Sequence, residues 1–224
     1  VEEQLIKQNI PYKIFGGVRF YDRKEIKDML AYFKLIANPS DVISLTRIVN
    51  VPSRKIGKKT LDTIEKYSQR NRITFCEAFY RSDEVGELSE GVKKRISDFI
   101  SFMAGLKEFI QEGSLGSLLE KIWTDTGYMK ELKSEQTIDA MNRIENLREL
   151  LTVTLEFEAR ATQEGFSKLV SFLDEISLLT DIDNYDQDSD AMVLMTLHNA
   201  KGLEFPVVFI IGMEEGIFPH SRSM

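Results

Sequence analysis

The stretch DRKEIKDMLAYFKLIA, residues 22–37, has the spacing of a helix with a wide apolar face. Asp22 followed by Glu25 resembles a capping box at its start. Asn38-Pro39 ends it, because the residue before a proline disfavours helical conformation. Its apolar side chains recur three or four positions apart, at Ile26, Met29, Leu30, Phe33, Ile36 and Ala37. The pattern therefore predicts a helix that packs into a core.

Helical periodicity continues for most of the chain, without an internal repeat. It predicts that residues 22–180 are nearly all helical, so the fold class is mainly α. The acidic run DIDNYDQDSD, residues 181–190, then predicts a solvated linker. A calcium loop would need Gly and Glu where Asp186 and Met192 stand. Beyond the first helix we expect helices at about 41–50, from 58, and at 88–112, 115–125, 134–162 and 166–180.

Short apolar runs flank this helical block. The end of a helix, then a strand and a glycine turn in IPYKIFGG, are predicted before it. AMVLMTL (191–197) and PVVFIIG (206–212) follow it and are rich in Val and Ile, as buried parallel strands are. The eight residues HNAKGLEF between these two runs are too short for a full crossover helix. We therefore predict a helical insertion within pieces of one α/β domain.

Composition limits the class of protein. The 224 residues are 42% hydrophobic and 29% charged, with a net charge of −7, as in a globular protein that is not a polycation. A single cysteine, Cys76, excludes a disulfide framework and a cysteine zinc site, and it favours a reducing, cytoplasmic location. No apolar run approaches the roughly 18 residues of a membrane span, and no signal peptide is present. Because the sequence begins at Val1 and ends just after a predicted strand, we expect a piece of a longer protein.

A basic hairpin stands out against the negative chain. Residues 45–72 contain eight basic and two acidic side chains, a local charge of +6. The segment PSRKIG between two predicted helices resembles the turn of a helix-hairpin-helix, in which N–H groups at the second helix start face a phosphate. Gly57 would let the backbone approach closely. The alternative is a solvated charged helix face, but the charge contrast favours a contact to DNA backbone without sequence preference.

Three other features of the sequence give little indication of a functional site. GKKT at 57–60 is not a phosphate-binding loop, because Lys59 follows the lysine and Pro52 stands where the first glycine belongs. Trp123 lies at helical spacing with apolar neighbours, which favours the core over base stacking. The two histidines, His198 and His220, pair with no nucleophile, so hydrolytic catalysis by them is not indicated.

Two long segments carry a family resemblance. MTLHNAKGLEFPVVFIIGMEEGIFPH resembles motif V of superfamily 1 DNA helicases of the UvrD/PcrA type. IPYKIFGGVRFYDRKEIKDMLAYFKLIANPSD and RIVNVPSRKIGKKTLD resemble the part of those helicases that enters their 2B subdomain. The resemblance implies a helical 2B subdomain, residues 21–189, inserted in a RecA-like α/β subdomain 2A, residues 1–20 and 190–224.

The resemblance also implies site residues. Glu204 would bind the ATP ribose, and Thr196 and His198 would lie by the single strand. The family's duplex-contacting turn, usually Arg-Gly-Ile-Gly, carries Lys55 in place of its first glycine, which adds charge and removes flexibility. Contacts to duplex DNA would come from Arg54, Lys55, Gly57, Lys58, Lys59 and Thr60.

The implied function is that of a fragment of an ATP-dependent 3′-to-5′ DNA helicase of repair or replication, in which 2B contacts duplex DNA and regulates unwinding. The cofactors of the intact protein would be ATP and Mg²⁺. Its partners would be DNA at a junction of single strand and duplex, and repair or replication proteins that bind 2B. The phosphate-binding loop and the magnesium carboxylates lie outside these residues in the family, so we expect no catalytic residue, no metal site, no bound cofactor and no ATPase activity in this chain alone. The alternative is a helical protein-interaction or autoregulatory module without a direct DNA role.

Overall fold

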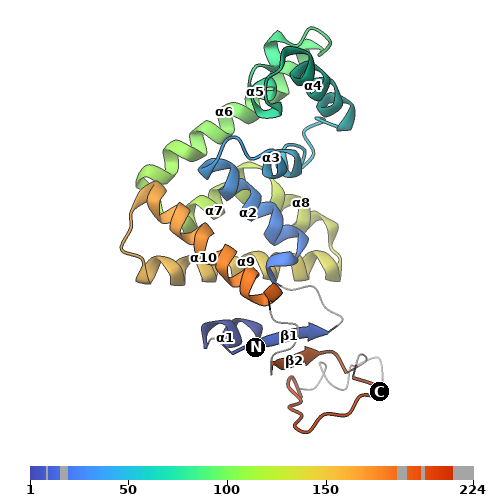
Figure 1. Ribbon diagram of the computed structural model, residues 1–224, viewed down its shortest axis with the longest axis vertical. Helices are drawn as coiled ribbons and strands as arrows, with labels where there is room; N and C mark the ends of the chain where they lie inside the picture. Colours follow the sequence, from blue (N-terminus) through green and yellow to red (C-terminus); the bar gives the residue numbers. More distant parts are fainter. Residues whose placement is uncertain (9, 16–19, 186–190, 198–199, 214–224) are drawn as a thin grey trace.

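A computed structural model describes residues 1–8, 10–15, 20–185, 191–197 and 200–213. Figure 1 shows a body of helices with the long helix α6 leading to α4 and α5 at one end, and a small sheet at the other. The mainly α fold class predicted from the sequence is confirmed. The elements are α1 (Glu2–Lys7), β1 (Tyr12–Phe15), η1 (Phe20–Asp22), α2 (Lys24–Ala37), α3 (Val42–Ile48), α4 (Lys58–Asn71), α5 (Phe75–Tyr80), η2 (Ser82–Glu84), α6 (Glu90–Glu112), α7 (Leu115–Asp125), α8 (Tyr128–Glu135), α9 (Ile138–Arg160), α10 (Gly165–Tyr185) and β2 (Met192–Met195).

The predicted core helix is α2, and it is buried nearly all round. It packs against α3, α6, α7, α9 and α10. Even Glu25 and Asp28 are buried, so the helix is more enclosed than one apolar stripe would suggest. The predicted capping box is wrong: the N-cap is Arg23, without a side-chain cap. Asp22 ends η1 and instead forms an ion pair with Lys27 of α2, with 2.6 Å between Oδ1 and Nζ.

Two helix boundaries differ from the predicted ones. The segment 134–162 is divided between α8 and α9, because Gln136 adopts a left-handed conformation at φ 51°. Thr137 is the N-cap of α9, and its hydroxyl accepts a hydrogen bond from the Ala140 N–H at 3.1 Å. The predicted linker is wrong in its first half, where α10 continues through Tyr185. Residues 186–190 lie outside the described residues.

The small sheet joins the segments that precede and follow the helical block. β1 and β2 pair in parallel, with Tyr12 opposite Met192, and lie side by side in Figure 1 although the helical block separates them in sequence. This pairing confirms the first predicted strand of the C-terminal part. The strand predicted at 206–212 is wrong: Val207 is 70% exposed and Phe209 78% exposed, outside any strand. Within the described residues no neighbouring strand offers these backbone groups a ladder.

The core extends through the whole helical body. Trp123 of α7 is 8% exposed and belongs to it, so the prediction of a core role is confirmed. No described helix is long and apolar enough to cross a lipid bilayer. What this core provides for the site is a rigid platform of α2 and α6, on which the segment between α3 and α4 rests.

Candidate nucleic-acid interface

The basic hairpin is the turn between α3 and α4, residues 49–57, and hydrogen bonds within the chain fix its shape. At the start of α3, Asp41 accepts the Ser44 N–H at 3.0 Å, which caps the helix. Asn50 lies just after α3, and its Oδ1 accepts the N–H groups of Arg54 at 2.8 Å and Ile56 at 3.1 Å. Ile56 is fully buried, so it anchors the turn in the core. The predicted pair of helices around a tight turn is therefore present.

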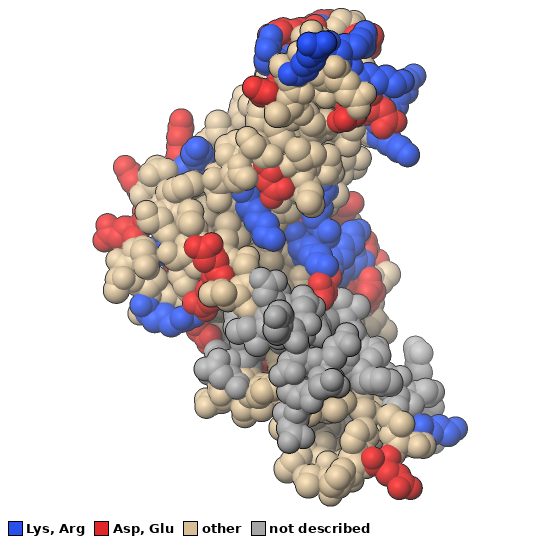
Figure 2. All heavy atoms as spheres, in the orientation of Figure 1, with Lys and Arg blue, Asp and Glu red and all other residues tan. Residues whose placement is uncertain are grey.

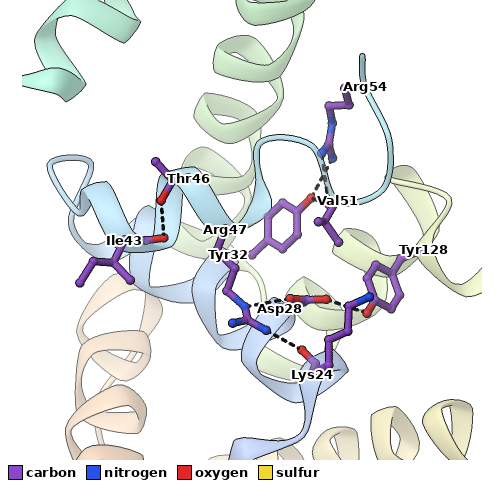
Figure 3. Close-up of polar contacts among 9 residues, drawn as sticks. All are labelled: Lys24, Asp28, Tyr32, Ile43, Thr46, Arg47, Val51, Arg54 and Tyr128. Atoms are coloured by element: carbon purple, nitrogen blue, oxygen red, sulfur yellow. Dashed lines mark hydrogen bonds and ion pairs between the residues drawn. The ribbon is translucent and has the colours of Figure 1, made fainter. Parts of the chain in front are cut away.

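Arg54 points into the protein and not toward solvent. Its guanidinium donates to the carbonyl oxygen of Ile48 at 2.9 Å. It also donates to the Val51 carbonyl at 3.2 Å and to the Tyr32 hydroxyl at 2.7 Å (Figure 3). It also lies over the ring of Phe99, 5.2 Å from the centroid. Sequence reasoning placed Arg54 among the DNA contacts, but here its donors are taken by the last carbonyls of α3 and the turn.

Tyr32 is the partner of Arg54 on α2, and the sequence gives no sign of this role beyond an apolar spacing. Its hydroxyl donates to the Val51 carbonyl at 2.7 Å while it accepts from Arg54. Burial raises the pKa of the Tyr32 hydroxyl, and the adjacent guanidinium acts in the opposite direction. The neutral phenol therefore ties the turn to α2.

Lys55, Lys58 and Lys59, in contrast, are exposed to solvent. Among the described residues, none of the three forms a hydrogen bond or ion pair through its side chain. Figure 2 shows Lys and Arg side chains around the end of the molecule formed by α4 and α5, with acidic ones among them. These three lysines are thus cations without a neutralising partner in the described chain.

The start of α4 adds backbone donors to these lysines. Gly57 is its N-cap and provides no side-chain cap, and the first turn has no acidic residue. The Gly57 carbonyl takes the N–H of Thr60 at 2.9 Å, which leaves the amides before Thr60 without an intrahelical acceptor. A Cβ at Gly57 would meet nothing within 4 Å, so the space in front of this helix end is open. Partial positive charge, free N–H groups and lysines suit an anion.

Lys55 stands in a strained conformation. Its φ is 57°, in the left-handed region that favours glycine. The resemblance to the family's Arg-Gly-Ile-Gly turn implies a glycine at this position. The backbone of Lys55 therefore adopts the conformation that suits the family's glycine, while its side chain adds a charge.

A buried polar cluster holds α3 on the platform. Asp28 of α2 accepts from Arg47 Nε at 2.8 Å and from the Tyr128 hydroxyl at 2.9 Å (Figure 3). Arg47 also donates to the Lys24 carbonyl at 3.1 Å. Burial, with the carboxylate of Asp28 next to it, raises the pKa of Tyr128, so its hydroxyl stays a donor. Sequence reasoning counted Arg47 only as part of the basic patch.

The described segment that follows β2, which contains Thr196 and Glu204, lies at the sheet end of the molecule, away from the hairpin (Figure 1). Thr196 directly follows β2 and is exposed, and its carbonyl accepts the Ala200 N–H at 3.0 Å. Glu204 is exposed outside any helix or strand. His198 and His220 lie outside the described residues. Within the described ranges no three His, Cys, Asp or Glu side chains gather to hold a metal.

Comparison with known proteins shows the family of this chain. All of residues 1–224 match the model of the UvrD-like helicase C-terminal domain, and the chain belongs to this family. Its similar relatives carry a more particular name. ATP-dependent DNA helicase PcrA of Bacillus subtilis is 45% identical over 230 residues, which cover 100% of this chain and 31% of the relative. The PcrA proteins of Staphylococcus epidermidis and Staphylococcus aureus are 43% and 40% identical over 227 residues, again covering 100% of this chain and 30% of each relative. The chain thus spans about a third of the length of these relatives.

Proposed function

We propose that this chain is part of an ATP-dependent 3′-to-5′ DNA helicase, in which the helical block acts as a 2B subdomain that contacts duplex DNA. The family match and the names of the relatives support the helicase assignment. Residues 21–189 form 2B in this proposal, and residues 1–20 with 190–224 belong to the RecA-like subdomain 2A. The return of the chain from α10 to pair β2 with β1 supports the insertion.

The observation that carries the duplex contact is the group of unpaired lysines at the open start of α4. Lys55, Lys58 and Lys59 would each neutralise a backbone phosphate, and the N–H groups between Gly57 and Thr60, at the start of α4, would face another. Because these contacts reach phosphates and no base edges, the binding would not depend on DNA sequence. Arg54 would act from behind, by holding the turn in shape.

The sheet end would serve ATP and the single strand in the intact protein. Glu204 would bind the ATP ribose, with Thr196 and His198 next to the strand. A carboxylate on the ribose positions the nucleotide but cannot stabilise a phosphoryl group in transfer, which needs cations, Mg²⁺ among them. The chain alone should therefore show no ATPase activity, with or without single-stranded DNA.

A salt titration of duplex binding tests the proposal. Lys55→Glu combined with Lys58→Glu should weaken binding to all duplex sequences alike. It should also flatten the slope of log affinity against log salt by about 2. Each phosphate contact releases roughly 0.9 counterion from the DNA, and the double variant loses two such contacts. The matched control is Lys130→Glu with Lys133→Glu, the same charge change at exposed, unpaired lysines of α8.

Equal slopes for the two double variants, with intact thermal melts, would mean that the hairpin is only a solvated charged face. Absence of duplex binding by the wild-type chain at any salt would favour the other reading, a protein-interaction or autoregulatory module.

A further inference from the structure

A pocket of about 380 Å³ opens beside the hairpin, against α6 and the end of α7. Its volume is within the range of sites that bind small ligands or single side chains. Arg54 lines it while donating to the backbone carbonyls of Ile48 and Val51. The lining residues are Arg54 of the hairpin, Arg95, Asp98, Phe99 and Phe102 of α6, and Asp125 and Thr126 at the end of α7.

Arg95 is the unusual member of this group. Its Nε is buried and has no hydrogen-bond partner, and no carboxylate of the described residues lies within ion-pair distance of it. A buried guanidinium N–H without an acceptor is unfavourable, whereas a carboxylate can accept from two guanidinium donors at once. An anionic oxygen pair entering the pocket would therefore gain a charged contact that the chain itself does not provide.

The other charged groups narrow the choice of ligand. Asp125 is paired with Lys121 at 2.7 Å, and both terminal nitrogens of Arg54 already donate within the chain. Asp98, three residues from Arg95 on α6, forms no ion pair in the described part of the chain, so it can accept from an incoming donor. The available charges are one cation and one anion, both next to aromatic rings.

This balance favours a peptide over a nucleic-acid strand. A strand has one negative charge per nucleotide and would meet the carboxylates of Asp98 and Asp125. A peptide segment can present a single carboxylate, a backbone N–H and an apolar side chain. Phe102 provides a half-buried ring for the last of these, and its edge-to-face contact with Tyr32, 6.4 Å between centroids, holds it in place.

We propose that this pocket binds a short acidic and aromatic peptide segment of a partner protein. The carboxylate of the segment pairs with Arg95, a peptide N–H donates to Asp98, and the aromatic side chain packs on Phe102. The inference does not depend on the duplex contact. Since Arg54 lines the pocket and also holds the turn, an occupant touches the residue that shapes the hairpin.

The minimal probe is N-acetyl-L-phenylalanine, which carries a carboxylate, an amide N–H and an aromatic ring. Titrated into the whole chain and followed by amide NMR shifts, it should perturb residues around the pocket with a dissociation constant on the order of 1 mM. N-acetyl-L-phenylalanine amide, which lacks the carboxylate, should bind about tenfold more weakly, because it cannot form the charged contact.

Two variants localise the effect. Arg95→Gln should weaken binding of the acid about tenfold and leave binding of the amide unchanged. Lys94→Gln, the same charge change at the exposed neighbour that does not line the pocket, should alter neither. Amide shifts far from the pocket report whether Arg95→Gln keeps the fold; should it not, the comparison of acid and amide on the wild-type chain decides.

Equal binding of acid and amide by the wild-type chain, or shifts that avoid the pocket, would overturn the proposal. Tighter binding of deoxyguanosine monophosphate than of the acid would also overturn it, and would assign the pocket to a nucleotide. The duplex titration of the lysine variants is a separate measurement, so either proposal can fail alone.

Discussion

The hairpin, residues 49–57, and the C-terminal segment, residues 196–213, both carry predicted site residues, but they are built differently. The hairpin is fixed by Asn50, Arg54 and the fully buried Ile56. The C-terminal segment leaves its apolar side chains outside, with Phe209 78% exposed and Ile211 63% exposed. The two assignments therefore rest on different support. Geometry and charge support the assignment of Lys55, Lys58 and Lys59 to a duplex contact. The assignment of Glu204 to the ATP ribose depends on its place in the family motif.

The largest expected difference between the two regions is in stability. Ile56→Ala removes a fully buried side chain and should lower the free energy of unfolding by about 2–5 kcal/mol. Phe209→Ala removes a larger side chain that is exposed, and should change it by less than about 0.5 kcal/mol. Urea denaturation of this chain measures both. Similar losses for the two variants would show that residues 206–213 pack in solution as tightly as the hairpin.

Arg54 gives the next largest effect. Arg54→Ala removes a charged donor from the carbonyls of Ile48 and Val51 and from Tyr32, and should cost about 3 kcal/mol in unfolding free energy. Arg54→Lys keeps the charge but lacks the planar fork, so it should recover only part of that stability.

Duplex binding by the same two variants separates the possible roles of Arg54. If Arg54 touched phosphate, Lys at this position would restore most binding, and Ala would change binding more than stability. Full stability in Arg54→Ala would contradict the inward orientation.

The sequence allowed a prediction of the hairpin's place but not of the direction of Arg54. Helical periodicity, Pro52 and the Ile56-Gly57 pair mark a turn between two helices. The local charge and the resemblance to the family's duplex-contacting turn placed Arg54 among the DNA contacts. Only the fold brings α2 close enough for the Tyr32 hydroxyl to accept a hydrogen bond from the Arg54 guanidinium. Such a contact, between residues 22 positions apart, has no local pattern that could reveal it.

The strand predicted at 206–212 illustrates the complementary limit. Val and Ile in a short run predict a buried strand, but a strand forms only where a neighbour supplies a hydrogen-bonded ladder. The run at 191–197 has that neighbour in β1, and a strand forms at Met192–Met195. The capping box at Asp22 was wrong for a related reason, because Lys27 offered the carboxylate another partner.

Glu204 tests the weaker side of the comparison. In the intact protein, Glu204→Ala should raise the KM for ATP roughly tenfold or more, through loss of one charged hydrogen bond of about 2 kcal/mol. The melting temperature should hardly change, because the side chain is exposed. Steady-state ATPase assays at saturating DNA give the KM. An unchanged KM would remove the ribose assignment and leave the hairpin proposal untouched.

The smallest expected effect separates conformation from charge at Lys55. Because its φ is 57°, Lys55→Gly relieves a left-handed conformation, which costs roughly 1–2 kcal/mol for a residue with a Cβ. The greater freedom of glycine in the unfolded chain offsets part of this. The net result should be a gain of about 0.5–1 kcal/mol in unfolding free energy, measured by urea denaturation.

The same variant removes one cation from the proposed duplex contact, so stability and binding should move in opposite directions. Its salt slope should flatten by about 1, for one lost phosphate contact. Arg72→Gly is the matched control, since Arg72 ends α4 with φ 55° and is exposed and basic, about 20 Å along the helix from Lys58. It should gain similar stability and keep the wild-type slope. If the salt slope of both variants flattened by the same amount, the whole of α4 would contribute to DNA binding through its general charge. The hairpin would then have no specific role in binding.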